Sequence, residues 1–444
     1  MVDGLGVSPV VTAVIADTAF AAATAHTAQT LAIPTTESGS LYCGQCHAAA
    51  PHYNGTNAQY YQFPATTLFV DHATSCGQCH AGGDFAANRD ILAEYAESRH
   101  GVTVNVPGKS NATTIWRGGN TTNASCAVSC HDSGQFQLFL TNRTAPTSSI
   151  IGTTTTGNAQ RKTLSCDSCH SNVATGAIRY YTTGDSDTVT ITIPNNNALT
   201  VTFADYNASH LCVTCHSAGR GSWGKGITTA TLSVPTPHYL PQGLTLVGEA
   251  GYEFTGRTYF EGLHQNIGRN ETLSGSTSGP CVTCHMGSNA DHTWEAVTKN
   301  SAGEITAIAS DACVKCHANN MSAATLEQRR VAFQDRLNDL VAALAAKRVT
   351  YTNTGSGSFV YLDNLGASLT LNNAANFTAL MTEQYPLIVD QVAFRPNLIG
   401  AMYNLKVFMN ARQDRGAYVH NRYYAEGLIT DSIDLVNDGI INGN

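Results

Sequence analysis

The strongest hydrophobic pattern of the chain lies after residue 320. Between Thr325 and Arg348 apolar residues return every three or four positions, which places them on one face of a long amphipathic helix. That face consists of Leu326, Phe333, Leu337, Leu340, Val341 and Leu344. Residues 350–371 are expected to be loop with short strands, and two more helices are predicted over 397–412 and 421–436, separated by Gly416. The C-terminal third is therefore predicted to be mainly helical.

Regular structure is predicted to be sparse before residue 320. A short helix is expected over Asp90–Arg99. Residues 189–193 and 199–203 alternate between apolar and polar positions around an Asn-rich turn, which predicts a β-hairpin. Long connections rich in Gly, Thr and Asn separate these elements, so most of this region is expected to be irregular.

The composition narrows the setting in which the chain works. Charged residues make up only 13% of the 444 residues, about half of the usual share of roughly 25%. Such a polar, weakly charged surface favours self-association or an extracellular environment. The formal net charge of −8 disfavours nucleic acid as a partner.

The sequence predicts neither a membrane span nor a signal peptide in this numbering. No stretch reaches the ~18 uninterrupted apolar residues that a spanning helix needs. The first residues lack a Lys/Arg-rich segment, and Asp3 and Asp17 interrupt the apolar run.

Every cysteine of the chain belongs to a pair that a histidine follows directly. Six pairs have the pattern C-x-x-C-H, and a seventh has one additional residue between its cysteines. This pattern is the attachment signature of c-type haem, in which both thiols bond to the porphyrin and the histidine ligates the iron. The pairs are Cys43 and Cys46, Cys76 and Cys79, Cys126 and Cys130, Cys166 and Cys169, Cys212 and Cys215, Cys281 and Cys284, and Cys313 and Cys316. The histidines that follow them are His47, His80, His131, His170, His216, His285 and His317.

Cysteine pairs also occur in zinc sites, redox dithiols and disulfide frameworks. A zinc site of this kind needs two ligand pairs, and an odd number of pairs leaves one unmatched. A redox dithiol normally occurs once, beside a βαβ pattern. Histidine accounts for only 16 residues of the chain, so chance does not place one after every pair. The sequence therefore predicts seven covalently bound haem c groups and leaves no thiol for catalysis or structural disulfides.

The remaining histidines match the second ligand that electron-transfer haems require. A low-spin haem has two axial ligands, and methionine can take the second place, but the chain has only six methionines. Two histidines on each iron would leave no coordination position for a substrate, which favours electron transfer over catalysis. The nine histidines outside the motifs are His26, His52, His72, His100, His210, His238, His264, His292 and His420.

Three of these histidines lie close to a motif in the sequence. His52 comes shortly after His47, His72 shortly before Cys76, and His210 shortly before Cys212. Such spacing would let the segment of one haem ligate the iron of a haem packed beside it.

Several segments after residue 210 resemble the large multihaem c-type cytochromes of metal-respiring bacteria and archaea. Gly416–Asn421 also resembles the C-terminal ligand segment of the pentahaem nitrite reductase and hydroxylamine oxidoreductase relatives, and Glu97–Gly101 is a looser match. The other matching segments are 237–243, 251–254, 259–264, 281–286 and 292–294.

The resemblance implies distal ligands and an architecture. By it, the favoured distal ligands are His100, His238, His264, His292 and His420, while His52, His72, His210 and His26 compete for the two places left. No motif ends in lysine, as the catalytic haem of those nitrite reductases does, and no marker of a tyrosine-crosslinked haem is present. The resemblance therefore implies a similar architecture more than a similar catalytic activity.

We expect a multihaem cytochrome c fold, mostly irregular with short helices and a few short β-hairpins wrapped round a chain of haems. The expected regions are an N-terminal arm (1–40), a seven-haem region (41–322), and a mainly helical C-terminal region that packs on the last haems (323–444).

The leading functional hypothesis is an electron conduit of seven bis-histidine haems. It would take electrons from redox proteins of the cell envelope and pass them to extracellular acceptors such as metal oxides. A sharper version is a subunit of an extracellular cytochrome filament, which the chain resembles in its low charge. In such a filament a histidine such as His26 would ligate a haem of the next subunit. The alternatives are a reductase of nitrogen or sulfur oxyanions with one five-coordinate haem, and a periplasmic storage cytochrome. The expected location is extracellular or at the cell surface, with the periplasm as the alternative.

Overall fold

The computed structural model describes part of the chain, and the described residues fall into two compact units. Unit 1 draws on residues 1–182 and 289–295, and unit 2 draws on residues 183–288 and 296–444. The described residues are 91–98, 100, 140, 166–172, 177–179, 189–193, 196–217, 224–237, 240–288, 290–353, 357–410 and 413–442.

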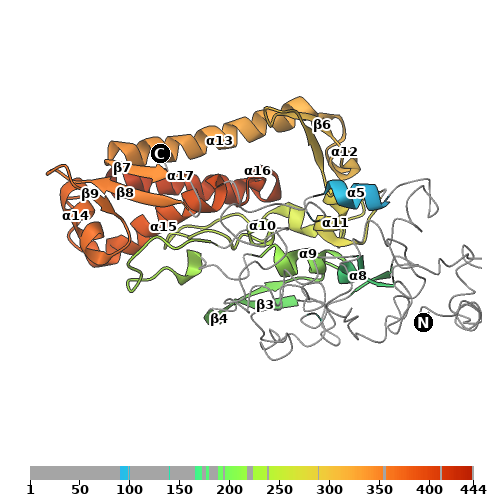
Figure 1. Ribbon diagram of the computed structural model, residues 1–444, viewed down its shortest axis with the longest axis horizontal. Helices are drawn as coiled ribbons and strands as arrows, with labels where there is room; N and C mark the ends of the chain where they lie inside the picture. The colour runs from blue at the N-terminus through green and yellow to red at the C-terminus, as the bar shows by residue number, and fades with distance from the viewer. Residues whose placement is uncertain are drawn as a thin grey trace, which may run out of the picture. The chain divides into compact units, whose positions relative to one another are not determined.

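Three long helices form the core of unit 2. Helices α13 (Ala323–Ala346), α15 (Gln391–Met409) and α17 (Arg422–Asp438) pack against one another, as Figure 1 shows. The expected face of α13 is confirmed at Leu326, Phe333, Leu337, Leu340 and Leu344, which are buried, while Val341 is half-buried.

Side-chain caps set the beginnings of these helices. Ser322, Asp390 and Asn421 each accept a hydrogen bond from the amide three residues further on, which satisfies one of the unpaired donors of the first turn. Helix α17 ends at Gly439, whose φ of 85° is the left-handed conformation that glycine adopts without strain.

The helical region differs from expectation in two places. The helix expected over 397–412 begins earlier, at Gln391, and continues through Pro396, because Asp390 caps it and Phe394 is buried in its first turns. Helix α14 (Ala374–Gln384) was not predicted. Its apolar face is short, with Phe377, Leu380 and Met381 buried.

The short strands pair into small antiparallel sheets. In unit 2, β7 (Val349–Thr352), β8 (Ser358–Leu362) and β9 (Ser368–Thr370) form a three-stranded sheet in that order, as expected for 350–371. The predicted hairpin is confirmed as β3 (Val189–Ile193) paired with β4 (Asn196–Phe203). The other pairs are β5 (Val297–Lys299) with β6 (Ile305–Ile308), and in unit 1 β1 (His170–Asn172) with β2 (Ala177–Ile178).

Short helices make up most of the remaining regular structure. The helix expected over Asp90–Arg99 is confirmed as α5 (Ile91–Glu97) of unit 1. The others are α8 (Cys166–Cys169) of unit 1, and in unit 2 α9 (Ser209–Cys215), η2 (Gly224–Gly226), α10 (Gln242–Leu246), η3 (Leu263–Asn266), α11 (Gly279–His285), α12 (Asp311–His317), η4 (Ala318–Asn320) and α16 (Ala417–His420). None of the helices described is long and apolar enough to cross a membrane.

Buried hydrogen bonds fix the segment after Gly248 against α15 and α17. Asn404 of α15 accepts from the amide of Tyr252 (2.6 Å) and donates to its carbonyl (3.0 Å), so one side chain satisfies both backbone groups. Tyr424 of α17 accepts from the Gly251 amide at 2.9 Å. The contact is close enough that a Cβ at Gly400 would lie 2.1 Å from the Tyr252 ring.

A buried aspartate of α17 holds the next turn of the same segment. Both oxygens of Asp431 accept hydrogen bonds from Arg257, at 3.0 and 2.9 Å, and the Tyr259 hydroxyl donates to Asp431 at 2.6 Å. Two side chains with three donor groups thus satisfy a carboxylate that is almost fully buried.

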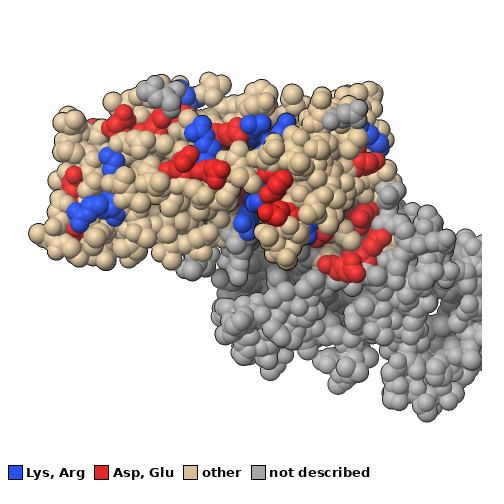
Figure 2. Space-filling model, turned by 90° about the horizontal axis from the view of Figure 1, so that it is seen from above, with Lys and Arg blue, Asp and Glu red and all other residues tan. Residues whose placement is uncertain are grey.

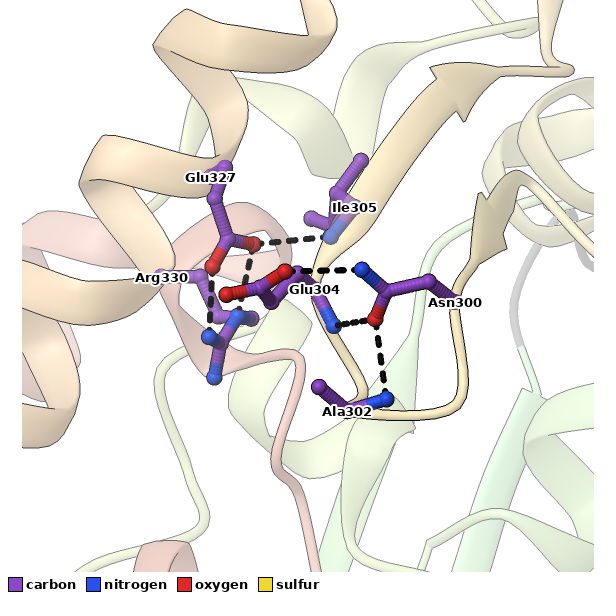
Figure 3. Close-up of polar contacts among 6 residues, drawn as sticks. All are labelled: Asn300, Ala302, Glu304, Ile305, Glu327 and Arg330. Atoms are coloured by element: carbon purple, nitrogen blue, oxygen red, sulfur yellow. Dashed lines mark hydrogen bonds and ion pairs between the residues drawn. The ribbon is translucent and has the colours of Figure 1, made fainter.

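The β5–β6 hairpin is joined to α13 by a carboxylate (Figure 3). Glu327 accepts from the amide of Ile305 at 2.9 Å and from the Arg330 guanidinium at 2.8 and 2.5 Å. The hydrogen bond from Arg330 is the main cause that lowers the pKa of Glu327 to about 2.

The turn of this hairpin is closed by Asn300. Its side-chain oxygen accepts from the amides of Ala302 and Glu304, both at 3.0 Å, and its amide group donates to the Glu304 carboxylate at 2.7 Å (Figure 3). These bonds close the turn that joins the two strands.

Charged groups are scattered over the described part of the face seen in Figure 2. On the face that Figure 2 shows, most described side chains are neither acidic nor basic, and Lys, Arg, Asp and Glu are interspersed. This agrees with the low charged fraction of the whole sequence.

We predict that Glu327→Gln lowers the free energy of unfolding by about 1–3 kcal/mol at pH 7, because it weakens charge-assisted hydrogen bonds to Ile305 and Arg330. The pKa of Glu327 is lowered from 4.5 to about 2 on folding, so its stabilisation is present above about pH 5 and is lost as the pH falls towards 2. Denaturant unfolding at pH 7 and pH 2.5 measures the difference.

The control is Glu304→Gln, which alters the exposed turn and should change stability by only a few tenths of a kcal/mol. An equal loss for E327Q at both pH values would contradict the assigned role of the carboxylate.

Candidate functional site

Four of the seven cysteine motifs have described residues, and in each the two cysteines lie one helical turn apart. Helices α8, α9, α11 and α12 carry the cysteines, and the histidine ends the helix or follows it directly. Residues three apart on a helix lie on the same face, so this arrangement suits two thioether bonds to one porphyrin edge. The motifs that begin at Cys43, Cys76 and Cys126 lie outside the described residues, as do His26, His52, His72 and His238.

Three motif histidines each face a second histidine from elsewhere in the chain. Two imidazoles bound to one iron from opposite sides place their ring centroids about 6 Å apart, because each metal–nitrogen bond is about 2 Å and each centroid lies about 1 Å behind its nitrogen. The pairs are His285 with His420 (6.3 Å), His317 with His264 (6.1 Å), and His170 with His292 (6.1 Å). Each pair has the ring separation that a shared iron would set.

The pair of His264 and His317 belongs to unit 2. Nδ1 of His264 donates to the carbonyl of Val419 at 2.6 Å, which leaves Nε2 as the nitrogen available to a metal. Burial, and then the neighbouring His317, lower the pKa of His264. The ring is thereby kept neutral, which is the form that ligates metals.

The pair of His285 and His420 also belongs to unit 2. Nδ1 of His420 lies 2.8 and 2.9 Å from the two oxygens of Asp414, a fully buried carboxylate. Burial acts to lower the pKa of His420, but the charge and the hydrogen bond of Asp414 outweigh it and raise that pKa. As in the other pair, Nε2 is the nitrogen left for a metal.

The pair of His170 and His292 belongs to unit 1. The amide of His292 donates to the Glu94 carboxylate at 3.0 Å, which ties its loop to helix α5. The Trp294 ring packs edge-on against His292 and against His100, with centroids 5.4 and 4.6 Å apart. The structure thus brings two of the expected distal ligands onto one indole.

The remaining motif histidine of unit 2, His216, is held by residues of α10. His216 donates from Nδ1 to Gln242 Oε1 at 3.2 Å, and its carbonyl accepts from the Gly243 amide at 2.6 Å. Burial lowers the pKa of His216 to about 4.

The His210 ring forms hydrogen bonds with the backbone a few residues before it. Its Nε2 lies 2.9 Å from both the Tyr206 amide and the Ala204 carbonyl. Only Nδ1 is therefore left for an iron, and its role as a ligand stays a prediction.

The surroundings of the pairs suit a porphyrin. Apolar side chains next to the ligand positions are exposed, with Leu263 72%, Phe260 48% and Val314 49% accessible. A porphyrin is a large apolar plate, and covering such side chains is favourable. When bound, haem would supply a one-electron redox couple, and these apolar side chains would cover part of it.

The motifs of unit 2 are neighbours. Helix α11 packs against both α9 and α12. The thiols of Cys212 and Cys281 share a hydrogen bond, and burial together with the nearby Cys313 and Cys316 raises the pKa of Cys284 to about 12. Porphyrins attached at these three helices would therefore be close to one another.

A zinc arrangement is not found in the ranges that the structure describes. There, no three His, Cys, Asp or Glu side chains gather around a point that could hold a metal ion. The histidines instead meet in twos, which a porphyrin iron requires and a protein-only zinc cage does not.

Sequence analysis missed Asp414 and Gln242, which fix His420 and His216. Neither residue lies at a spacing that a motif could indicate, because each contact arises where one element packs on another. An aspartate shortly before a glycine and a predicted ligand, as in Asp414-Arg415-Gly416, is the only available signal.

Comparison with known proteins finds similarity to C-type polyheme cytochromes. The chain is 33% identical over 312 residues to the C-type polyheme cytochrome OmcB of Geobacter sulfurreducens, which is 65% of this chain and 39% of OmcB. It is 30% identical over 419 residues to the C-type polyheme cytochrome OmcC of the same species, which is 85% of this chain and 51% of OmcC. The chain thus spans about half of the curated relatives or less. No family model and no solved structure matches it.

The relatives support the prediction of a multihaem c-type cytochrome. Both relatives bear the name of C-type polyheme cytochromes. The number of seven haems, the individual ligands and the region boundaries stay predictions. The chain is a relative of the polyhaem c-type cytochromes, and covalently bound haem c is the cofactor that this relationship implies.

Proposed function

We propose that this chain is an electron-transfer cytochrome with seven haems, each held by two histidines, that passes electrons to extracellular acceptors. The observation that carries the proposal is the three facing histidine pairs at 6.1–6.3 Å. An iron with two imidazoles has no open position, so it exchanges electrons through the porphyrin edge and does not bind a substrate.

The packing of the motif helices supports a conduit. Because α11 is in contact with both α9 and α12, an electron on one of their haems would have a near neighbour to move to. The three motifs in the first 131 residues would extend this series. Redox proteins of the cell envelope are the proposed donors, and metal oxides are among the proposed acceptors.

We further propose that copies of the chain assemble into a filament outside the cell or at its surface. The low charged fraction of 13% supports close association of copies, since little like-charge repulsion opposes it. Nine histidines outside the motifs for seven irons leave a surplus, and one, such as His26, is proposed to ligate a haem of the next copy.

A reductase of nitrogen or sulfur oxyanions is the competing function, and a periplasmic storage cytochrome is another. The reductase needs a five-coordinate haem. The three pairs would close both axial positions of three irons, so an open iron would have to belong to another motif.

We predict that His264→Ala and His420→Ala each convert one low-spin haem to a high-spin, CO-binding haem. The physical reason is that either change removes one of two axial ligands while the thioether bonds remain. Electron paramagnetic resonance and CO titration of the purified holoprotein measure the effect.

The matched control is Val419→Ala, which keeps the backbone carbonyl that accepts from His264 and should leave every haem low-spin. If wild-type protein already binds CO at one haem, the reductase would be favoured. If neither histidine variant changes the spin state, the ligand assignment would be wrong.

We predict that the intact mass of the purified holoprotein exceeds that of the polypeptide by seven haems.

We predict that native extracellular material contains filaments of this chain in electron micrographs. Particles that stay monodisperse at high protein concentration would remove the filament from the proposal and leave the conduit.

A further inference from the structure

Asp414 is a buried charge with an unusual set of partners. Its side chain is fully buried, and its oxygens accept from His420 Nδ1 at 2.8 and 2.9 Å and from the Gly416 amide at 3.0 Å. Across the parts of the chain that the structure describes, its one ion-pair partner is His420, and neither lysine nor arginine pairs with it. A buried carboxylate without a cation is costly unless another positive charge compensates it.

The local backbone is built around this contact. The Asp414 amide donates to the Val407 carbonyl at 3.1 Å, which fixes the residue to the end of α15. A Cβ at Gly416 would lie 2.9 Å from Cε1 of His420, so only glycine allows the imidazole to approach the carboxylate this closely. The geometry thus presents the His420 ring to Asp414 on one side and to His285 on the other.

An iron held by His285 and His420 would supply a positive charge close to Asp414. Fe³⁺ in a porphyrin dianion carries a net charge of +1, and Fe²⁺ carries none. With Nε2 of His420 on the iron, Nδ1–H donates to Asp414, and this outer hydrogen bond makes the imidazole a more basic ligand. Both effects stabilise the ferric state relative to the ferrous state.

The other described outer partners are neutral. Nδ1 of His264 donates to the Val419 carbonyl at 2.6 Å, and Nδ1 of His216 donates to the Gln242 amide oxygen at 3.2 Å. These groups orient their rings without adding a charge. Among the three histidines whose Nδ1 partner is described, His420 alone has an anionic one.

We propose that Asp414 is a positioning residue that sets the haem of His285 and His420 at a lower reduction potential than the neighbouring haem of His264 and His317. This inference rests on the proposed function, which assigns the two pairs as ligands. Since α11 and α12 are in contact, the difference would make electron transfer from the α11 haem to the α12 haem favourable.

The test is Asp414→Asn in the full holoprotein. Asparagine keeps the size and a hydrogen-bond acceptor for Nδ1–H but removes the charge. Spectroelectrochemical titration, with each low-spin ferric haem followed by electron paramagnetic resonance, should show one midpoint potential rising. The expected rise in that midpoint potential is at least about 59 mV, which for one electron is a tenfold change in the equilibrium constant of reduction. The spectra should stay low-spin.

The matched control is Asp431→Asn. Asp431 is also a buried aspartate of unit 2, but Arg257 and Tyr259 are its partners, so its loss should lower stability and leave all midpoint potentials unchanged. Unchanged potentials in D414N with full haem content, or an equal shift in D431N, would overturn the inference. A high-spin iron at His285 in wild-type protein would instead contradict the proposed function.

A measurement on wild-type protein covers the case in which D414N does not assemble. Redox-difference infrared spectra of protein with ¹³C-labelled aspartate should contain a carboxylate band that shifts when one haem is reduced. Absence of any redox-linked aspartate band would overturn the inference.

Discussion

The facing histidine pairs of unit 2 depend on buried hydrogen bonds that tie the chain between Gly251 and Tyr259 to α15 and α17. His264 follows this segment, and His420 lies directly before α17, so both of these histidines are held against the same helical core. Asn404, Tyr424 and Asp431 supply the bonds, and each of them satisfies polar groups that would be costly to bury alone. A pair of rings about 6 Å apart tolerates little displacement, and a rigid support of this kind provides the required accuracy.

Electrostatics distinguishes ligand positions that the sequence pattern treats alike. Burial lowers the pKa of His216 and His264, which keeps both rings neutral and ready to bind a metal. His420 differs because a buried carboxylate faces its outer nitrogen. Neighbouring haems attached by identical motifs would therefore have different potentials.

Local patterns predicted the regular elements well where one face is strongly apolar. Helix α13 and the β3–β4 hairpin agree with their expected ranges because periodicity and turn composition point to the same structure. Helix α14 was missed because its buried face has only a few residues, and α15 was predicted too short because a proline inside a helix normally marks its beginning. In both cases tertiary burial outweighed the local signal.

The sequence by itself determined the covalent chemistry of this protein. Two thiols and a histidine within one helical turn form a complete local unit, so the motifs indicate haem attachment without knowledge of the fold. The tertiary structure alone decided which second histidine faces each of His170, His285 and His317, because each partner comes from a distant segment. It also decided that Asp414 meets His420, since that contact needs the end of α15 and the turn at Gly416 to fold against each other.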